Sequence, residues 1–222
     1  MNILALDTAT ESCNVGLWLN GQVRERQVPG RQHAEQLLQM IRDLLDESGI
    51  VPSQLDAIAF GRGPGMFTGL RIGAGITQGL AFALDIPVVP ISSLAALARA
   101  CDAEHVLAAI DARMEQVYWG AFRRQGDVVE SMGDEQVTAP TKVHVQGGAT
   151  WIGCGSGWDR YGSELEAALG DRFGGWREGC SPRASDIACL AEPILRAGGG
   201  LAAEEAVPVY VRDDVARKPQ VP

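Results

Sequence analysis

The stretch GRGPGMFTGLRIGAGITQGLAFAL, from Gly61 to Leu84, decides how the rest of the chain is arranged. It opens with three glycines around Pro64, directly after an apolar run that predicts a buried strand over Leu55–Phe60. Met66–Leu84 then predicts a helix with almost no polar face, which we expect to be covered on more than one side. One cover would be the helix's own sheet, and the other could be a second chain.

Small residues recur at every fourth position of this helix, in two rows. The rows are Gly69, Gly73, Thr77 and Ala81, and Gly75, Gly79 and Ala83. Such rows form flat grooves on a helix. Four interior glycines cost about 2–4 kcal/mol in all relative to alanine, which the close approach of another backbone can offset. A helix buried inside a two-layer domain explains the pattern equally well, so both interpretations stay open.

The glycine turn before this helix is a weak phosphate-binding signal. It lacks the Lys-Ser/Thr pair of a Walker A loop, and it does not spell GxGxxG. No acidic residue follows the next predicted strand, Val88–Ile91, to hold a ribose.

Length, charge and cysteine content limit the class of protein. The 222 residues can form one large domain or two lobes of about 100 residues each. A net charge of −9 argues against a self-sufficient nucleic-acid surface, although a basic partner could supply one. Five cysteines without a CxxC pair predict reduced thiols in a cytoplasmic protein. The start of the chain has no signal-peptide pattern, and Arg71 interrupts the apolar helix, so we expect no membrane segment.

The first half of the chain predicts a mixed sheet with helices on its faces. Three antiparallel strands come first, joined in part by a two-residue hairpin turn at Asn20-Gly21, and a parallel β-α-β-α-β run follows. The predicted strands are residues 3–6, 13–19, 22–28, 55–60 and 88–91, and the predicted helices are residues 33–47 and 66–84.

The second half is less regular, and we expect a second lobe to begin near residue 100. Strands at 105–110 and 116–122 flank a turn, a hairpin follows at 126–127, and a short strand begins at Trp151. Further helices are predicted at residues 92–101, 161–169 and 184–197. The predicted domains are residues 1–98 and 99–222, with the last residues packing back on the first lobe.

The sequence offers few residues for catalysis. The three histidines, His33, His105 and His144, contain no HxxxH pair, so we predict no metal site, and no GxSxG motif indicates a serine hydrolase. Asp7 follows the first strand, where related nucleotide-binding sheets place a carboxylate that faces magnesium. We favour a simpler interpretation, an aspartate that caps the turn into the second strand.

Two further clusters have a functional and a structural interpretation each. Asp111 and Arg113 could contact a ligand, or they could be a turn aspartate with a surface arginine. The loop with Gly153, Gly155 and Gly157 could approach a phosphate with its backbone amides, or it could be a tight turn before a helix.

Seven motifs together resemble the bacterial TsaB (YeaZ) family, in order and across nearly the whole chain. They are DTAT at 7–10, HAEQLL at 33–38, GRGPGMFTGLRIG at 61–73, ISSLAALA at 91–98, DARMEQVY at 111–118, GCGSGW at 153–158 and PVYVRDDVARK at 208–218. The resemblance implies an α/β, two-lobed actin-like ATPase (ribonuclease H-like) fold. Its N-terminal lobe would hold a mixed five-stranded sheet with flanking helices, and its second lobe would be smaller and degenerate.

The same resemblance implies an accessory role in making threonylcarbamoyladenosine next to the anticodon of tRNA. The chain would be the non-catalytic partner of the metal-dependent TsaD enzyme, together with the ATPase TsaE, and would reach tRNA only indirectly. It implies no catalytic residue and no cofactor bound by this chain alone, while allowing a nucleotide at the partner interface. The alternative is a small actin-like ATPase or kinase, or an M22-like glycoprotease, acting on its own. The missing HxxxH pair and the weak phosphate motifs favour the accessory role.

We expect the central helix and the 33–47 helix to form the partner interface, and to pair two copies of the chain when it is alone. The expected interface residues are Leu37, Met40, Ile41, Gly69, Leu70, Gly73, Ile76, Thr77 and Leu80. A degenerate nucleotide site would involve Asp7, Gly153 and Gly155.

Overall fold

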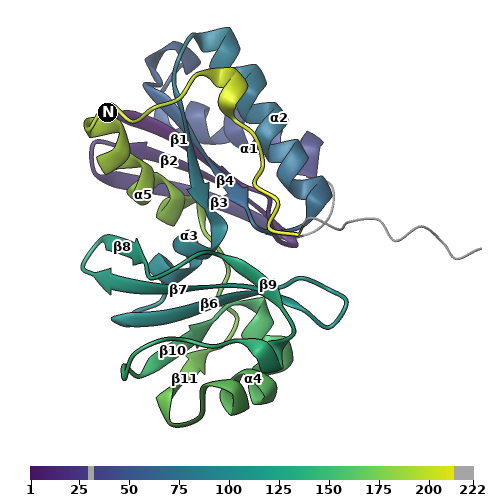
Figure 1. Ribbon diagram of the computed structural model, residues 1–222. Coiled ribbons are helices and arrows are strands. Elements are labelled where there is room, and N and C mark those ends of the chain that lie inside the picture. The colour runs from purple at the N-terminus through teal and green to yellow at the C-terminus, as the bar shows by residue number, and fades with distance from the viewer. Residues whose placement is uncertain (30–32, 213–222) are drawn as a thin grey trace, which may run out of the picture.

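The computed structural model describes residues 1–29 and 33–212, which fold into two lobes, one above the other in Figure 1. The first lobe is built on a five-stranded sheet of order β3-β2-β1-β4-β5. β1, β2 and β3 are antiparallel neighbours, whereas β4 and β5 run parallel to β1, so the predicted mixed sheet is confirmed. The strands are β1 (Asn2–Asp7), β2 (Ser12–Leu19), β3 (Gln22–Pro29), β4 (Ala57–Gly63) and β5 (Val88–Ser92).

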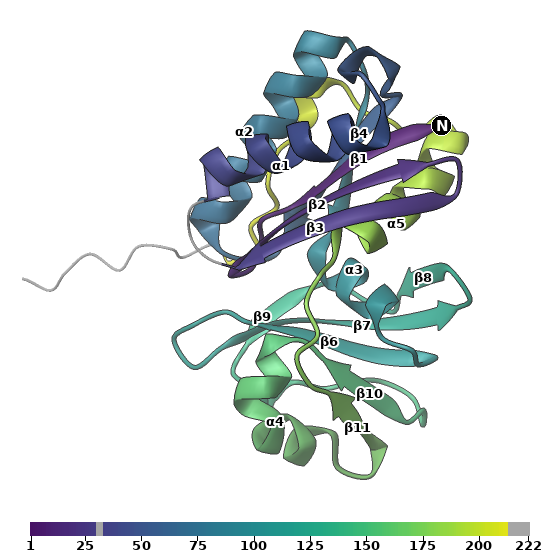
Figure 2. The ribbon, with the colours of Figure 1, turned by 180° about the vertical axis from the view of Figure 1, so that it is seen from behind.

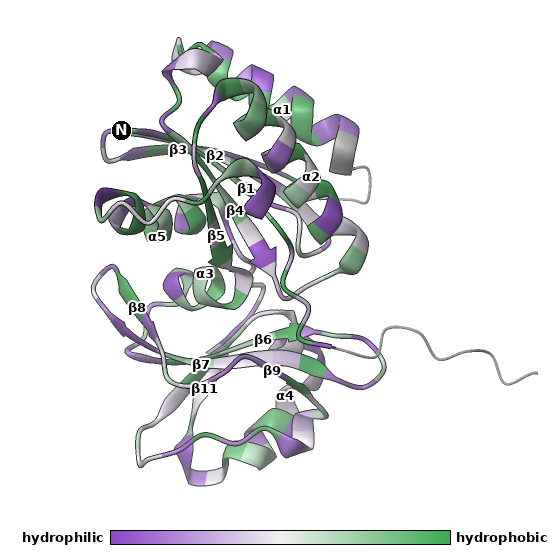
Figure 3. Cartoon of the chain, turned by 45° about the horizontal axis from the view of Figure 1, so that its top comes forward, coloured by the Kyte–Doolittle hydropathy of each residue, from purple (hydrophilic) through white to green (hydrophobic). Residues whose placement is uncertain are grey.

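Both faces of this sheet are covered by helices. Leu4 and Leu6 of β1 belong to the apolar cluster formed with α1 and α2, whereas Ile3 and Ala5 belong to the cluster formed with α5. A strand covered on both faces needs apolar residues at successive positions, which explains the unbroken run that starts the chain. The helices are α1 (His33–Ser48), α2 (Phe67–Leu84) and α5 (Ala184–Arg196), and Figure 3 shows α1 and α2 together on one side with α5 on the other.

The second lobe contains a six-stranded sheet of order β11-β10-β6-β7-β8, with β9 paired to β7. Its strands are β6 (His105–Asp111), β7 (Val117–Gln125), β8 (Val128–Ser131), β9 (Gln136–Thr138), β10 (Trp151–Cys154) and β11 (Phe173–Arg177). The sequence did not predict β9 or β11, because the first is three residues long and the second contains Gly174 and Gly175. α4 (Ser156–Leu169) begins before the predicted helix start at Tyr161, which has non-helical dihedrals (φ −126°, ψ 30°) and interrupts it. With two lobes, each built on a sheet with flanking helices, the chain has the predicted α/β architecture.

The chain crosses between the lobes twice. α3 (Ser93–Ala100) leads into the second lobe, so the division after residue 98 falls inside a helix. Ser92 starts α3 by accepting hydrogen bonds from the Leu94 and Ala95 amides, each at 3.1 Å. After β11 the chain returns, and α5 and the segment that follows it up to Tyr210 pack on the first lobe. Short 3-10 turns occur at Pro52–Gln54, Pro140–Lys142, Gly170–Arg172 and Ala203–Glu205.

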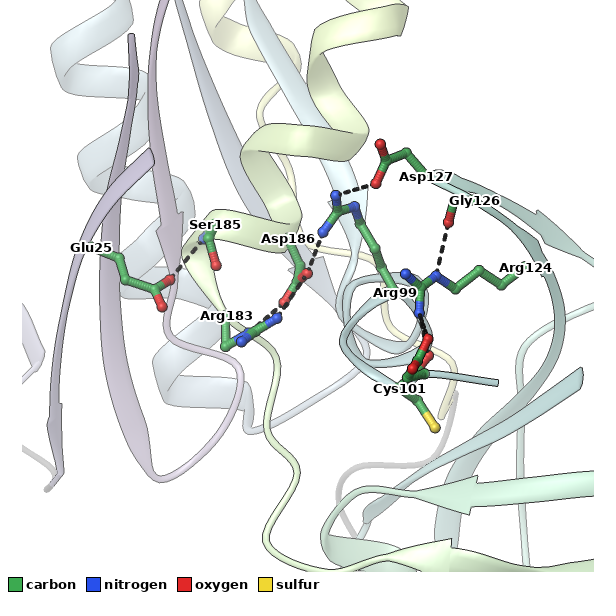
Figure 4. Close-up of polar contacts among 10 residues, drawn as sticks. Glu25, Arg99, Cys101, Arg124, Gly126, Asp127, Arg183, Ser185 and Asp186 are labelled. Carbon is green, nitrogen blue, oxygen red and sulfur yellow. Dashed lines mark hydrogen bonds and ion pairs between the residues drawn. The ribbon is translucent and has the colours of Figure 1, made fainter. Parts of the chain in front are cut away.

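A buried carboxylate holds this junction together at the start of α5, as Figure 4 shows. Asp186 is fully buried and accepts from Arg99 on α3 and from Arg183, each at 2.7 Å. The other terminal nitrogen of Arg99 reaches the exposed Asp127 in the β7–β8 turn, also at 2.7 Å. Arg99 therefore links α5 of the first lobe to a hairpin of the second.

None of the helices within the described residues combines the length and the apolar character needed to cross a lipid bilayer. α2 is the most apolar long helix, and it carries Arg71 on an exposed position.

Candidate functional site

The glycines at the start of α2 let the helix approach the turn after β1. A Cβ atom at Gly69 would lie 1.9 Å from the Thr8 carbonyl oxygen, and one at Gly65 would lie 2.3 Å from the Ala9 carbonyl oxygen. The Thr8 hydroxyl donates to the Gly69 carbonyl at 2.7 Å, and the Met66 amide donates to the Ala9 carbonyl at 2.7 Å. These glycines are thus required by a contact inside the chain.

This packing bears on the expected partner interface, which stays a prediction. Gly69, Gly73 and Thr77 are buried inside the first lobe, and a Cβ at Gly73 would lie 2.5 Å from Thr8 Oγ1 in the turn after β1. The remaining expected residues are also mostly internal. Leu37, Met40, Ile41 and Leu70 are at most 5% exposed, and only Ile76 and Leu80 are half-buried. A row that already packs inside its own lobe is not a free surface on the monomer.

The second row of small residues faces outward instead. A Cβ atom at Gly75 or Gly79 would meet nothing within 4 Å, and both residues are exposed. Phe82 on the same face is 82% exposed, and Phe67 at the start of the helix is 40% exposed. Leu38 adds a further apolar side chain, 39% exposed, from the neighbouring α1. We call this surface the outer face of α2, defined by Phe67, Arg71, Gly75, Gly79 and Phe82.

Asp7 is the last residue of β1, and its side chain is buried rather than exposed to solvent. It is 1% exposed, with the Ala9 amide and the Ser93 hydroxyl each donating to it at 3.1 Å. A Cβ atom at Gly61 would lie 2.0 Å from Asp7 Oδ2, so the glycine makes room for the carboxylate. Burial raises the pKa of Asp7 to about 7, against the opposing effect of the two hydrogen bonds. The bond from Ala9, two residues on, is the turn cap that the sequence favoured.

Gly153 and Gly155 are likewise used for packing. The Trp158 indole lies over Gly153, where a Cβ atom would come within 2.2 Å of the ring, and its Nε1 donates to the Leu107 carbonyl at 2.8 Å. Gly155 has φ +103° and would place a Cβ atom 2.4 Å from both the Ala109 carbonyl oxygen and Leu97. The three residues expected to form a degenerate nucleotide site therefore do not line a common opening.

A cleft of about 940 Å³ lies between the lobes. Asp111 and Arg113, at the β6–β7 turn, lie in it and form an ion pair at 3.1 Å. Arg160 of α4 pairs with Asp111 at 3.0 Å, and Glu11 of the first lobe pairs with Arg113 at 2.6 Å. The sequence singled out Asp111 and Arg113 but not Glu11 or Arg160, since no local pattern marks them.

Apolar and polar residues from both lobes complete the wall of the cleft. They include Met66, Phe67, Leu70, Tyr118, Ser156, Cys180, Val209, Tyr210 and Arg212. Neither Asp7 nor the glycines at 153 and 155 are among them.

In the described ranges, no group of three or more His, Cys, Asp or Glu side chains is placed to hold a metal ion. His105 packs edge-on against Trp151, and His144 packs edge-on against Trp119, so each has an aromatic neighbour rather than a second ligand. The helix that begins at His33 is described, whereas the surroundings of that side chain lie outside the described residues.

Comparison with known proteins gives a consistent family. A family model described as TsaD, tRNA N6-adenosine threonylcarbamoyltransferase, matches residues 27–150. The tRNA threonylcarbamoyladenosine biosynthesis protein TsaB of Escherichia coli is 39% identical over 98% of this chain and 97% of its own length. The TsaB protein of Haemophilus influenzae is 38% identical over 98% and 96%. The solved structure of YeaZ from Pseudomonas aeruginosa is 45% identical, covers 94% of this chain and 99% of its own, and superimposes with a TM-score of 0.88.

Proposed function

Since this chain belongs to the TsaB family of tRNA threonylcarbamoyladenosine biosynthesis proteins, we propose that it is a non-catalytic partner subunit in that biosynthesis. It activates a metal-dependent TsaD-type enzyme, together with a TsaE-type ATPase, in the transfer of threonylcarbamoyl to the adenosine next to the anticodon. It forms a homodimer when the partners are absent, and it reaches tRNA through them.

The outer face of α2 is the observation that carries this proposal. Glycine in a helix costs about 0.8–1 kcal/mol relative to alanine, and among the described residues none comes close enough to Gly75 or Gly79 to exclude a Cβ atom there. A partner helix that approaches the backbone at these positions would explain why glycine occurs there. Phe82 beside them is 82% exposed, which is a large apolar side chain left in water on a free monomer.

The enclosed carboxylate supports an accessory role. A magnesium-bound nucleotide needs an ionised, accessible carboxylate, whereas Asp7 is sealed and has a pKa raised to about 7. The glycine loop at Gly153 and Gly155 is filled by Trp158 and Leu97. We propose that the chain alone binds no nucleotide, and that any nucleotide in the complex sits at the partner interface.

Reconstituted transfer to tRNA, with TsaD-type and TsaE-type partners and with or without this chain, tests the role. Gly79→Leu fills the outer face and is expected to lower transfer by at least about tenfold, the effect of 1.4 kcal/mol of lost pairing energy. Light scattering should show the same variant as a weaker homodimer.

Gly148→Leu is the matched control, because Gly148 is also exposed and a Cβ there meets nothing within 4 Å. It should pair and support transfer as the wild type does. Wild-type pairing and transfer by Gly79→Leu would remove the outer face from the proposal.

Asp7→Ala tests whether the chain has chemistry of its own. In a folded complex this variant should keep transfer within about tenfold of wild type, and the purified wild-type chain should not turn over ATP-Mg. A loss of about 100-fold, or roughly 2.7 kcal/mol, would indicate that Asp7 takes part in catalysis.

A further inference from the structure

The segment from Val207 to Arg212 runs from the first lobe to the mouth of the cleft, and we call it the strap. It follows the last 3-10 turn and leaves along α2, where Gln78 Nε2 donates to the Ala206 carbonyl at 3.1 Å. The Val209 amide then donates to the Arg62 carbonyl at the end of β4, at 2.8 Å. The strap is extended but belongs to neither sheet, so its position depends on these few contacts.

One side chain of the strap anchors it to the beginning of α2. The Tyr210 ring packs on Phe67 with 5.3 Å between the ring centroids. Arg71, one turn further along α2, lies 3.9 Å from the Phe67 centroid and donates from Nε to the Tyr210 hydroxyl at 3.1 Å. The strap thus touches the same residues that begin the outer face of α2.

The end of the strap reaches across to the other lobe. Arg212 donates to the Ala112 carbonyl at 3.1 Å and to Gln116 Oε1 at 2.5 Å, on the two sides of the β6–β7 turn. Its guanidinium also lies 5.8 Å from the centroid of the Tyr118 ring on β7. A charged donor that satisfies two acceptors of one turn holds that turn in place.

The β6–β7 turn, to which Arg212 donates these hydrogen bonds, has an unfavourable backbone conformation. Arg113, Met114 and Glu115 have φ of 59°, 54° and 57°, three left-handed residues in succession without a glycine. Such conformations are disfavoured by roughly 1 kcal/mol per residue and persist when the surroundings enforce them. The enforcing contacts come partly from the first lobe, since Glu11 pairs with Arg113 from the opposite side of the cleft.

We propose that the strap and Glu11 form a latch between the lobes, which keeps the cleft closed and ties its state to the beginning of α2. When Arg212 or Glu11 is released, the left-handed turn loses the contacts that hold it and the second lobe moves away. When Phe67 or Arg71 is displaced, Tyr210 and the strap move with it. Arg212 then loses its hydrogen bonds to the β6–β7 turn. The latch does not depend on the function proposed above.

Cys180 provides a native probe of the latch, because it lines the cleft and is half-buried. Alkylation by a small maleimide, followed by peptide mass spectrometry, gives the labelling rate of Cys180. Cys189 on α5 is also half-buried but does not line the cleft, so it serves as the internal reference. Labelling of such a thiol tracks the population of the open form.

Arg212→Ala is expected to raise the Cys180 labelling rate about tenfold relative to Cys189, since it removes two charge-assisted hydrogen bonds. Glu11→Gln tests the contribution of the Glu11–Arg113 ion pair to the latch. The Glu11 side chain is 68% exposed, so this change should not destabilise the fold. Glu11→Gln and Tyr210→Phe should each raise the rate about two- to threefold, the effect of a partly exposed contact. Arg196→Ala is the matched control, because the Arg196 side chain is 72% exposed and pairs with Glu192 within α5.

The result that supports the latch is faster labelling of Cys180 alone in Arg212→Ala and Glu11→Gln, with Arg196→Ala at the wild-type rate. Unchanged Cys180 labelling in both latch variants would overturn the proposal. An equal rise at Cys180 and Cys189 would also overturn it, because it would indicate general loosening of the fold.

Discussion

Gly69 and Gly79 lie on the same helix and should respond to alanine in opposite directions. Alanine at Gly69 forces a Cβ atom against the Thr8 carbonyl oxygen and should cost about 1–3 kcal/mol of unfolding free energy. Alanine at Gly79 meets open space and should add about 0.5–1 kcal/mol through helix propensity. Urea denaturation at a concentration where the chain is monomeric measures both. Equal effects at the two positions would contradict the assignment of inner and outer rows.

Asp7 should make the protein less stable as the pH rises. Its pKa is about 7 in the folded chain and 3.8 as a model value, so the folded state holds its proton more tightly. The stabilisation is therefore complete below about pH 4 and is lost as the pH rises to about 7, amounting to roughly 4 kcal/mol.

Asp7→Asn should remove this loss, so that its stability relative to wild type rises by a few kcal/mol between pH 5 and pH 8. Denaturation curves at the two pH values measure the difference. Asp46→Asn, which removes a carboxylate at an exposed position on α1, is the matched control for the change of charge. Parallel curves for wild type and Asp7→Asn would show that Asp7 does not gain a proton on folding.

At the scale of elements, Arg99 joins α3 to α5. It pairs with two carboxylates, Asp186 and Asp127, that lie in opposite environments. Asp186 has no exposed side-chain surface, and Asp127 is 85% exposed. Asp186→Ala leaves Arg99 and Arg183 without their buried partner and should cost about 3–5 kcal/mol. Asp127→Ala removes an exposed pair and should cost about 0–1 kcal/mol. Thermal melts of the two variants give the comparison, and similar losses would mean that burial does not govern this junction.

The sequence predicted most elements, but it could not decide which side of α2 faces inward. Both rows of small residues repeat every four positions and contain two glycines, so the local pattern is the same for either orientation. The deciding contact is with Thr8, 61 residues earlier in the chain than its partner Gly69. The sequence also did not predict the cleft, because its walls meet through contacts between residues far apart in the chain. Glu11 and Arg113, for example, are 102 residues apart. Asp7 was predictable as a turn cap because its contact with Ala9 is local.

At the scale of the whole molecule, the charge predicts weak binding to tRNA. Contacts to phosphates supply most non-specific affinity, and the chain carries a net charge of −9. The isolated protein should bind tRNA with a dissociation constant above about 1 µM at physiological salt. A filter-binding titration measures this, with the complex containing the TsaD-type partner as the positive control. Submicromolar binding by the isolated chain would contradict indirect contact with tRNA.

The return of α5 to the first lobe also sets an order of events during synthesis. Ile3, Ala5 and Ala59 are among the first apolar residues to leave the ribosome, yet the helix that covers them ends at Arg196. The strands and α4 of the second lobe lie in one continuous stretch, so that lobe can fold on the nascent chain while the first still exposes one face of its sheet. A premature stop codon before residue 184 would leave that face bare for the lifetime of the product. We expect such a truncated chain to aggregate or be degraded, although it would retain α1, α2 and the whole second sheet.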